Sequence, residues 1–375
     1  FFKYYGFIVT NLNAILPFYI PYRKLELPIG ISFYTFQTLS YIIDVYRGNV
    51  DVQVNLIDFG TYVTMFPQLI AGPIVQYADV ERQLRERKES LTKFGYGAWF
   101  FVMGLAKKVL LANTIGSIYE NIAAMDGMSV VTAWLGCLAY TFQIYFDFSG
   151  YSDMAVGLGK MFGFEFMQNF NYPYISKSVT EFWRRWHISL GSWVREYVYI
   201  PLGGNRVTVP RHLLNLLIVW FLTGLWHGAS WNFVVWGLFY GVILITEKYF
   251  TGKILAKLPG AVQTLYTMIL VMLGWVLFFS PTLGSALTWI GNMFGQGATG
   301  FMDSQALYLI MRNWLFWVAG IIGSTPFMQL LGKRLVFNEE RPHTVLAGCL
   351  MAGLFVLCVA YLVTESYNPF LYFRF

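Results

Sequence analysis

Charged side chains are scarce in this sequence. Asp, Glu, Lys and Arg make up only 12% of its 375 residues, whereas hydrophobic residues make up 57%. A soluble domain carries about twice that share of charge. Many apolar runs approach the roughly 20 residues that are needed to cross the hydrocarbon core of a bilayer. The composition therefore excludes an ordinary soluble protein and predicts an all-α, polytopic integral membrane protein.

Cysteine is equally uncommon, and its placement follows no chemical pattern. Cys137, Cys349 and Cys358 all lie within apolar stretches, and no two of them have CxxC spacing. An odd number of widely spaced cysteines does not fit a disulfide framework and gives no basis for a metal site. We therefore interpret all three as small buried hydrophobic residues.

Low-complexity linkers and internal repeats are absent from the sequence, so we expect a single domain over residues 1–375. An initiating Met and a cleavable signal pattern are also lacking, and we expect further N-terminal hydrophobic segments before Phe1. The clearest membrane-spanning candidates are the apolar runs 27–46, 96–115, 130–146, 213–227, 231–246, 262–279, 307–330 and 344–363. Interrupted runs predict broken or buried segments at 1–20, 57–74 and 151–164.

Lys and Arg are missing from the loops 119–129 and 280–305. Other loops concentrate these residues, around 82–93, 177–211, 248–257 and 333–341. Because cytoplasmic loops are enriched in Lys and Arg, we expect the basic loops inside, and the other two loops and the C-terminal tail outside. The net charge of +6 is spread over short loops rather than one continuous face, which argues against nucleic acid as a partner and for membrane lipid.

One apolar run, 213–246, contains a histidine in the stretch "FLTGLWHGASW". An ionisable side chain in hydrocarbon costs about 2 to 3 kcal/mol or more, so His227 needs an explanation. The run is long for one crossing, and the basic residues at its ends, Arg211 and Lys248, predict a hairpin that turns near Gly228. His227 at the tip of this hairpin is a candidate catalytic residue; a satisfied core histidine is the alternative.

The segment "EFWRRWHISLGSWVREYVYI" differs from the spanning candidates. Its tryptophans recur at roughly helical spacing and polar residues occupy the other face, which predicts a helix at the membrane interface with His187 on it. An ordinary interface histidine is the alternative to a functional one at this position. His212 and His343 flank spanning candidates beside Arg residues, and we interpret both as interface residues.

Two carboxylates lie in the apolar stretch "QIYFDFSGYSDMAVGLGKMFGF". An unpaired buried carboxylate would become neutral, so we expect Asp147 and Asp153 to have partners within the bundle, such as an Arg or a histidine. They either hold the core together around a polar, substrate-binding tunnel or form helix-terminal caps near Gly150.

Five stretches together closely resemble one family: "LPIGISFYTFQTLSYIIDVYRG", "FPQLIAGPIVQY", "YFDFSGYSDMAVGLG", "NFNYPYISKSVTEFWRRWHISL" and "GLWHGASW". The sequence resembles the membrane-bound O-acyltransferases (MBOAT) of the bacterial alginate and peptidoglycan O-acetylation type, nearly continuously over 27–249. This resemblance implies an MBOAT-type helical bundle with broken, re-entrant and interfacial helices in the bacterial cytoplasmic (inner) membrane, with further N-terminal helices. It implies that His227 of the WHG motif is catalytic and that His187 of the RRWH motif is the second invariant polar position.

The resemblance also implies a reaction. An acetyl group would pass from a cytoplasmic thioester, acetyl-CoA as a substrate without any bound cofactor, to an extracytoplasmic polysaccharide such as peptidoglycan, alginate or another exopolysaccharide. Neutral His227 can act as the general base, and Asn232 or the indole of Trp226 can donate to the developing oxyanion. A basic cluster would either bind the CoA phosphates or anchor the cytoplasmic face. Its members are Arg184, Arg185 and Arg195.

The C-terminal sequence "NPFLYFRF" resembles the short aromatic motif of some cell-surface polymer acylation systems, in which a tyrosine is proposed to carry the acyl group. Here that residue is Tyr372, which would pass the acyl group to a serine-type (SGNH-like) acetyltransferase outside the membrane. A tyrosine of the interfacial aromatic belt is the alternative.

Two other classes of protein compete with the enzyme. A polytopic transporter or flippase of a cell-envelope export system would also bury polar residues in broken helices, but it often has paired interruptions in two related halves. The sequence shows no such pair of halves. A non-catalytic scaffold would leave the cost of burying His227 unexplained.

Overall fold

The computed structural model describes residues 1–23, 25–28, 30–69, 72–335, 345–364 and 370–371 of the chain. Within these ranges the chain forms helices and turns and no β-strand. The helices that frame the interior are α6 (Leu91–Ala106), the π-helical η1 (Lys107–Asn113), α7 (Thr114–Ala123), α8 (Val130–Met161), α11 (Val209–His227), α12 (Trp231–Thr246) and α14 (Gly260–Phe279).

Shorter elements surround this frame. The N-terminal ones are α1 (Tyr5–Asn13), α2 (Ile31–Arg47), α3 (Leu56–Thr64), α4 (Tyr77–Val80) and α5 (Gln83–Glu86). Between α8 and α11 lie η2 (Pro173–Ile175), α9 (Val179–Arg185), α10 (Ile188–Val194) and η3 (Arg195–Tyr199). The C-terminal half adds η4 (Glu247–Thr251), α13 (Gly252–Leu255), α15 (Leu283–Met293), α16 (Ser304–Arg312), α17 (Trp314–Gly323), α18 (Phe327–Leu335) and α19 (Val345–Thr364).

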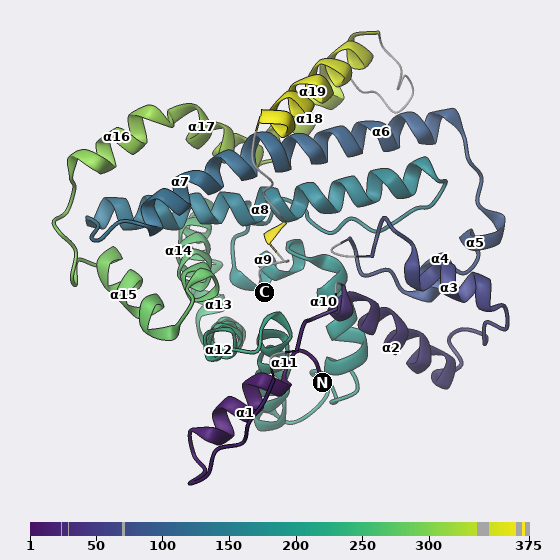
Figure 1. The fold of residues 1–375 in the computed structure, drawn as a ribbon, viewed down its shortest axis with the longest axis horizontal. Helices are drawn as coiled ribbons and strands as arrows, with labels where there is room; N and C mark the ends of the chain where they lie inside the picture. The colour runs from purple at the N-terminus through teal and green to yellow at the C-terminus, as the bar shows by residue number, and fades with distance from the viewer. Residues whose placement is uncertain (24, 29, 70–71, 336–344, 365–369, 372–375) are drawn as a thin grey trace.

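Two long antiparallel elements lie side by side across the molecule: the continuous helix α6–η1–α7 and the 32-residue helix α8 (Figure 1). Glycines at the same seven-residue spacing make this contact possible. Gly97 and Gly104 of α6 lie against Gly157 and Gly150 of α8, and a Cβ at either α6 position would run into the carbonyl oxygen of its partner. Such close approach of backbones is the usual basis of helix association in membranes.

The predicted hairpin near Gly228 is confirmed. Helix α11 ends at His227 and α12 begins at Trp231, so the two arms are joined by a three-residue tip. The arms cross closely because both carry glycine at the crossing: a Cβ built on Gly224 would lie 3.2 Å from the Cα of Gly237. The hairpin thus fixes the position of the residues at its tip.

Five helices of the described residues are long and apolar enough to cross a membrane, at Leu91–Ala123, Val209–His227, Trp231–Leu255, Gly260–Phe279 and Val345–Thr364. A bent pair, α16 and α17, meets at 64° and gives a sixth span if it is counted as one. The protein is therefore a polytopic helical membrane protein, as its composition predicted.

Some predicted segments differ from the structure. The runs 130–146 and 151–164 were predicted as separate, but residues 130–161 form the single helix α8, in which Asp147, between the two runs, pairs with Lys108 of the neighbouring helix. The run 307–330 is divided among α16, α17 and α18. The first break falls at Asn313 and a second at 324–326, so this run is not one straight helix.

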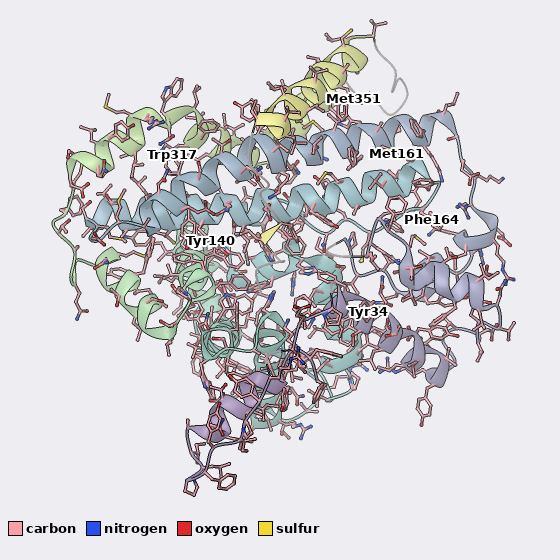
Figure 2. The ribbon with its side chains drawn as sticks, in the orientation of Figure 1. Tyr34, Tyr140, Met161, Phe164, Trp317 and Met351 are labelled. Carbon is pink, nitrogen blue, oxygen red and sulfur yellow. The ribbon has the colours of Figure 1, made fainter. Side chains whose placement is uncertain are left out.

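The predicted single helix around His187 is wrong. Helix α9 ends at Arg185 and α10 begins at Ile188, and His187 between them has φ 46°, a left-handed conformation that a continuous helix cannot contain. The tryptophans of this segment are in the core: Trp186 and Trp193 are buried. Figure 2 shows side chains filling the space below α8, where Tyr140 lies 4.9 Å from the ring of Phe279.

Candidate active site

His227 is the last residue of α11 and is 7% exposed. The helix stops there because Gly228 adopts an extended backbone, with φ −164° and ψ 150°. A Cβ at Gly228 would collide with the ring of Phe233, the third residue of α12. The glycine of the WHG motif is thus required by close packing at the hairpin tip, and it sets the position of His227.

Aromatic rings from two helices surround the His227 imidazole. The ring of Trp236 on α12 lies 4.9 Å from it, and that of Phe278 on α14 lies 5.2 Å from it, both edge to face at 80°. The neighbouring Trp226 contributes a third contact at 4.8 Å. This arrangement excludes bulk water from the imidazole and fixes its plane.

His187 is held by hydrogen bonds of its own loop. Its Nδ1 lies 3.2 Å from Oδ1 of Asn169, an oxygen that already accepts hydrogen bonds from the backbone N–H and the hydroxyl of Ser189. Because Asn169 Oδ1 is the acceptor in this contact, Nδ1 of His187 carries the proton and donates. The other ring nitrogen, Nε2, is then an acceptor. In the described part of the chain this buried Nε2 has no hydrogen-bond partner.

The environment keeps His187 neutral. The residue is 2% exposed and lies outside the candidate spans, and burial lowers the pKa of its imidazole to about 3. Left-handed backbone at a non-glycine residue and an unpartnered buried nitrogen are both costly, and such features gather at functional sites. His187 thus offers a fixed hydrogen-bond acceptor rather than a charged group.

Trp226 joins the two histidines. Its ring lies 6.2 Å from that of His187 and 4.8 Å from that of His227. Phe36 of α2 stacks on the indole at 5.4 Å and 16°, and Lys3 donates a hydrogen bond to the Trp226 carbonyl. The structure therefore brings together three residues that the sequence analysis selected from two separate motifs.

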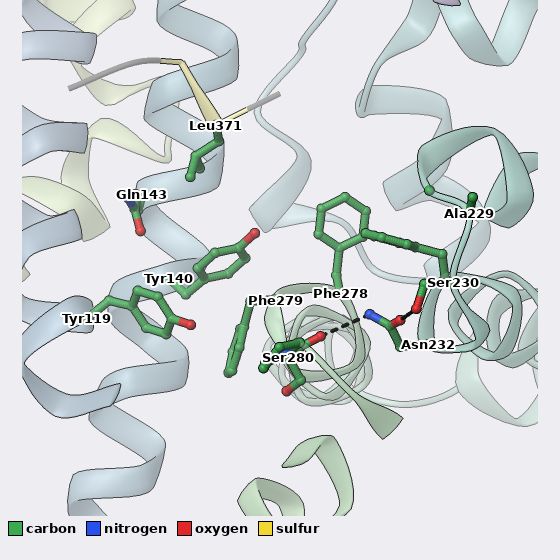
Figure 3. Close-up of a pocket in the computed structure, with 13 residues that line it drawn as sticks. Tyr119, Tyr140, Gln143, Ala229, Ser230, Asn232, Phe278, Phe279, Ser280 and Leu371 are labelled. Carbon is green, nitrogen blue, oxygen red and sulfur yellow. Dashed lines mark hydrogen bonds between the residues drawn. The ribbon is translucent and has the colours of Figure 1, made fainter. Parts of the chain in front are cut away.

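A cavity of about 440 Å³ lies beside the hairpin tip (Figure 3). Phe278 both contacts His227 and lines this cavity, and the residues that follow His227 form one wall. Among the residues that the structure describes, all lining side chains are uncharged. They come from the hairpin tip, the end of α14, α7, α8 and the tail: Tyr119, Tyr140, Gln143, Gly228, Ala229, Ser230, Asn232, Phe233, Phe278, Phe279, Ser280, Pro281 and Leu371.

Asn232 is fixed on the wall of the cavity. Its Nδ2 donates to the carbonyl of Ser280 at 2.9 Å, and its Oδ1 accepts from the hydroxyl of Ser230 (Figure 3). One of the two amide N–H groups is therefore used within the protein. On the opposite wall, the buried Oε1 of Gln143 has no partner among the described residues, so it can accept a hydrogen bond from a hydroxyl group in the cavity.

The three candidate arginines are not equivalent. Arg185 is half-buried, forms a 2.8 Å ion pair with Glu181 and donates to the carbonyl of Asn171 at 3.1 Å. It therefore supports the break before His187. Arg184 and Arg195 are exposed.

Both carboxylates have a cationic partner within the bundle, as expected, although neither partner is an Arg or a histidine. Asp147 pairs with Lys108 at 2.5 Å and Asp153 pairs with Lys107 at 2.6 Å, so lysines rather than Arg or histidine provide the positive charge. Both carboxylates lie well inside α8, which also rules out helix-terminal caps. The signal in the sequence was a pair of adjacent lysines inside the apolar run 96–115.

Tyr372 lies outside the described residues. The two residues before it are buried against α8: Phe370 stacks on Tyr151 at 4.8 Å and 27°, and the backbone N–H of Leu371 donates to Asp147 Oδ2 at 2.9 Å. Leu371 also lines the cavity (Figure 3). The tail and the WHG hairpin, far apart in the sequence, therefore share one cavity.

Residues 49–278 match the model of the MBOAT, membrane-bound O-acyltransferase family. This chain belongs to that family. The MBOAT match covers more than half of the chain, including both RRWH and WHG. The protein is therefore a membrane-bound O-acyltransferase.

Named relatives agree with the MBOAT assignment. The chain is 40% identical to the probable alginate O-acetylase AlgI of Pseudomonas putida, over 100% of this chain and 81% of the relative. It is 47% identical to the Azotobacter vinelandii protein of the same name, over 100% of this chain and 82% of the relative. It is 36% identical to the peptidoglycan O-acetyltransferase of Helicobacter pylori, over 79% of this chain and 62% of the relative.

Proposed function

We propose that this O-acyltransferase moves an acetyl group from cytoplasmic acetyl-CoA across the bacterial inner membrane for O-acetylation of an extracytoplasmic polysaccharide. The observation that carries the proposal is the position of His227, at a hairpin tip that forms one wall of a cavity shared with the C-terminal tail. Alginate and peptidoglycan are the polymers in the names of these three relatives, and the two alginate-type proteins among them match the whole chain.

His227 acts as the general base in the proposed transfer. The acceptor hydroxyl loses its proton to the imidazole while its oxygen bonds to the thioester carbonyl carbon. The carbon–sulfur bond then breaks, and the thiolate of CoA leaves and takes up the proton. A positioned base of this kind contributes about 10²- to 10⁴-fold to the rate. Asn232, through its remaining N–H, and the Trp226 indole are the proposed donors to the oxyanion.

The donor is bound from the side of the basic loops. Arg184 and Arg195 are exposed and carry the positive charge that the phosphates of CoA require. Arg185 is occupied by Glu181, so we assign it to the support of the loop rather than to the donor.

The lining of the cavity supports a neutral first acceptor. Alginate is a polyanion, and buried carboxylates require cationic or hydrogen-bonding partners. The described residues of the cavity wall offer aromatic rings, hydroxyls and amides and include no cation. A phenol fits this environment, and Leu371, the neighbour of Tyr372 in the sequence, lines it. We therefore assign Tyr372 as a covalent relay that passes the acetyl group to a serine-type (SGNH-like) acetyltransferase outside.

The test is acetyl transfer by the purified protein. Detergent-solubilised protein is incubated with isotopically labelled acetyl-CoA, and incorporation into the C-terminal peptide is measured by mass spectrometry. The wild type should become labelled at Tyr372, and His227→Ala should lose the label at unchanged melting temperature. Labelling of His227→Ala at a rate near that of the wild type would overturn the assignment. A transporter or flippase would not produce labelled protein at all.

A further inference from the structure

Adjacent lysines of η1 form two ion pairs with α8, and these pairs differ in their surroundings. In the Lys107–Asp153 pair the side chains are 27% and 25% exposed, whereas in the Lys108–Asp147 pair they are 15% and 2% exposed. Burying an ion pair so completely is costly unless further hydrogen bonds satisfy the remaining lone pairs. The second oxygen of Asp147 is satisfied by the tail, through the backbone N–H of Leu371 at 2.9 Å.

An aromatic ring of the tail packs against α8 next to the Asp147 carboxylate. Phe370 stacks on Tyr151 at 4.8 Å and 27° and contacts Phe148 at 5.7 Å. Asp147, Phe148 and Tyr151 lie within one turn of α8, and residues four apart lie on the same face of a helix. One stretch of α8 therefore contacts both a backbone amide and a side chain of the tail, below the middle of the helix (Figure 1).

These contacts reach the active site. Phe148 touches Phe370 on one side and the imidazole of His187 on the other, at 4.7 Å and 89°. Leu371, whose N–H is held by Asp147, lines the cavity beside the hairpin tip. A shift of the tail by one residue would therefore change which side chain enters the cavity.

We propose that Asp147, held by Lys108, and the Phe148–Tyr151 surface form a docking site for the C-terminal aromatic peptide. Asp147 is a positioning residue that sets the register of the tail by binding the N–H of Leu371. The ligand of the site is a neutral peptide with an aromatic residue followed by a free backbone amide. That the docking serves to present Tyr372 rests on the proposed function, but the docking itself does not.

The experiment measures protection of the tail in the solubilised full chain, with no acyl donor present. Chymotrypsin cleaves after Tyr372, and the released tripeptide, residues 373–375, is quantified by mass spectrometry. Leu371→Pro removes the backbone N–H that donates to Asp147, whereas Leu371→Ala keeps it. We expect tripeptide release to be at least about tenfold faster in Leu371→Pro than in the wild type, and Leu371→Ala to remain within about threefold of the wild type. Equal rates in Leu371→Pro and wild type would overturn the proposal.

Double variants of the two Lys–Asp pairs test whether release of the tail is specific to the Lys108–Asp147 pair. Lys108→Met with Asp147→Asn removes the docking pair without leaving a lone buried charge. Lys107→Met with Asp153→Asn removes the neighbouring pair, which has no hydrogen bond or ion pair to the described tail residues, 370–371. Only the first double variant should release the tail. Equal release by both would show general loosening of α8 and would overturn a specific docking site.

The docking assay separates this inference from the relay. Tyr372→Phe abolishes a phenol relay but remains a chymotrypsin site, so its tail should stay protected. Loss of protection in Tyr372→Phe would show that the phenol, rather than the Leu371 amide, holds the tail, and would contradict the inference. If the wild-type tail were protected from chymotrypsin but Tyr372 were not acetylated, docking would be established and the relay would be ruled out.

Discussion

His187 and His227 pack against the same indole ring, that of Trp226, at centroid distances of 6.2 and 4.8 Å. One histidine comes from a strained loop and the other from a helix end, so a rigid aromatic group fixes their relative position. His187 presents a buried Nε2 with no partner among the described residues, and this acceptor can orient a hydroxyl or the donor's amide groups. His227 is then left to take the proton.

The first prediction separates the imidazole of His187 from its backbone conformation. Asn tolerates left-handed backbone, so His187→Asn should fold, and it should lose acetyl transfer by at least about tenfold because its shorter side chain places no acceptor at the position of Nε2. His187→Ala should in addition lose about 1 kcal/mol or more of stability through the strained φ. Thermal melting and acetyl transfer are measured on both variants. Wild-type transfer by His187→Asn would contradict a functional role.

The second prediction concerns pH. Because burial lowers the pKa of His187 from 6.5 to about 3, the unfolded chain binds a proton that the folded chain does not between these values. Stability from this group is therefore present above pH 6.5 and is lost as the pH falls toward 3. The decrease in melting temperature between pH 7 and pH 5 should be smaller for His187→Asn than for the wild type. An unchanged decrease would contradict a buried, neutral His187.

The third prediction concerns the glycine of the WHG motif. Gly228→Ala places a methyl group into the ring of Phe233 and should cost about 1 to 3 kcal/mol by overpacking, with loss of transfer because His227 moves. Gly348→Ala on α19 is the control, since an added Cβ there meets nothing within 4 Å. A melting temperature for Gly228→Ala equal to that of the wild type would contradict the close packing at the hairpin tip.

The fourth prediction concerns donor binding. Exposed charges contribute about 0.5 to 1 kcal/mol each, so Arg184→Gln and Arg195→Gln should each raise the KM for acetyl-CoA about two- to fivefold with little change in kcat. Arg82→Gln, an exposed residue of another basic loop, is the control. A fall in kcat without a change in KM would assign these arginines to the fold instead.

Sequence reasoning located His227 because the signal is local. Basic residues at both ends of one apolar run, and a glycine in its middle, are sufficient to predict a hairpin with His227 at the tip. The break at His187 was not predictable from the pattern, since apolar spacing is helical on both sides of it. Its left-handed backbone depends on Asn169 and Ser189, whose contacts form only in the folded chain.

The identity of the lysine that pairs with each buried carboxylate could also not be predicted from the sequence. Lys107 and Lys108 precede Asp153 and Asp147 by dozens of residues, and nothing in the local sequence specifies which cation faces which acid. The π-helical turn of η1 and the glycine contacts between α6 and α8 decide the pairing. The sequence pointed to a function for the tail only through resemblance, because an aromatic terminal segment is equally typical of an interfacial belt, and it did not predict that Leu371 lines the cavity.

The last prediction concerns Tyr372 itself. Tyr372→Phe keeps the size of the ring and removes the hydroxyl that would carry the acetyl group. Polymer acetylation in cells should be lost at a normal protein level, because the described residues of the cavity wall give an anionic polymer no cationic partner for entering directly. Moving the phenol by one position, in Tyr372→Phe with Phe373→Tyr, is the matched test of register. Since the Leu371 amide is bound to Asp147, the moved phenol should not restore acetylation. Full acetylation by cells with Tyr372→Phe would rule out the relay, and restoration by the moved phenol would show that the register of the tail is not fixed.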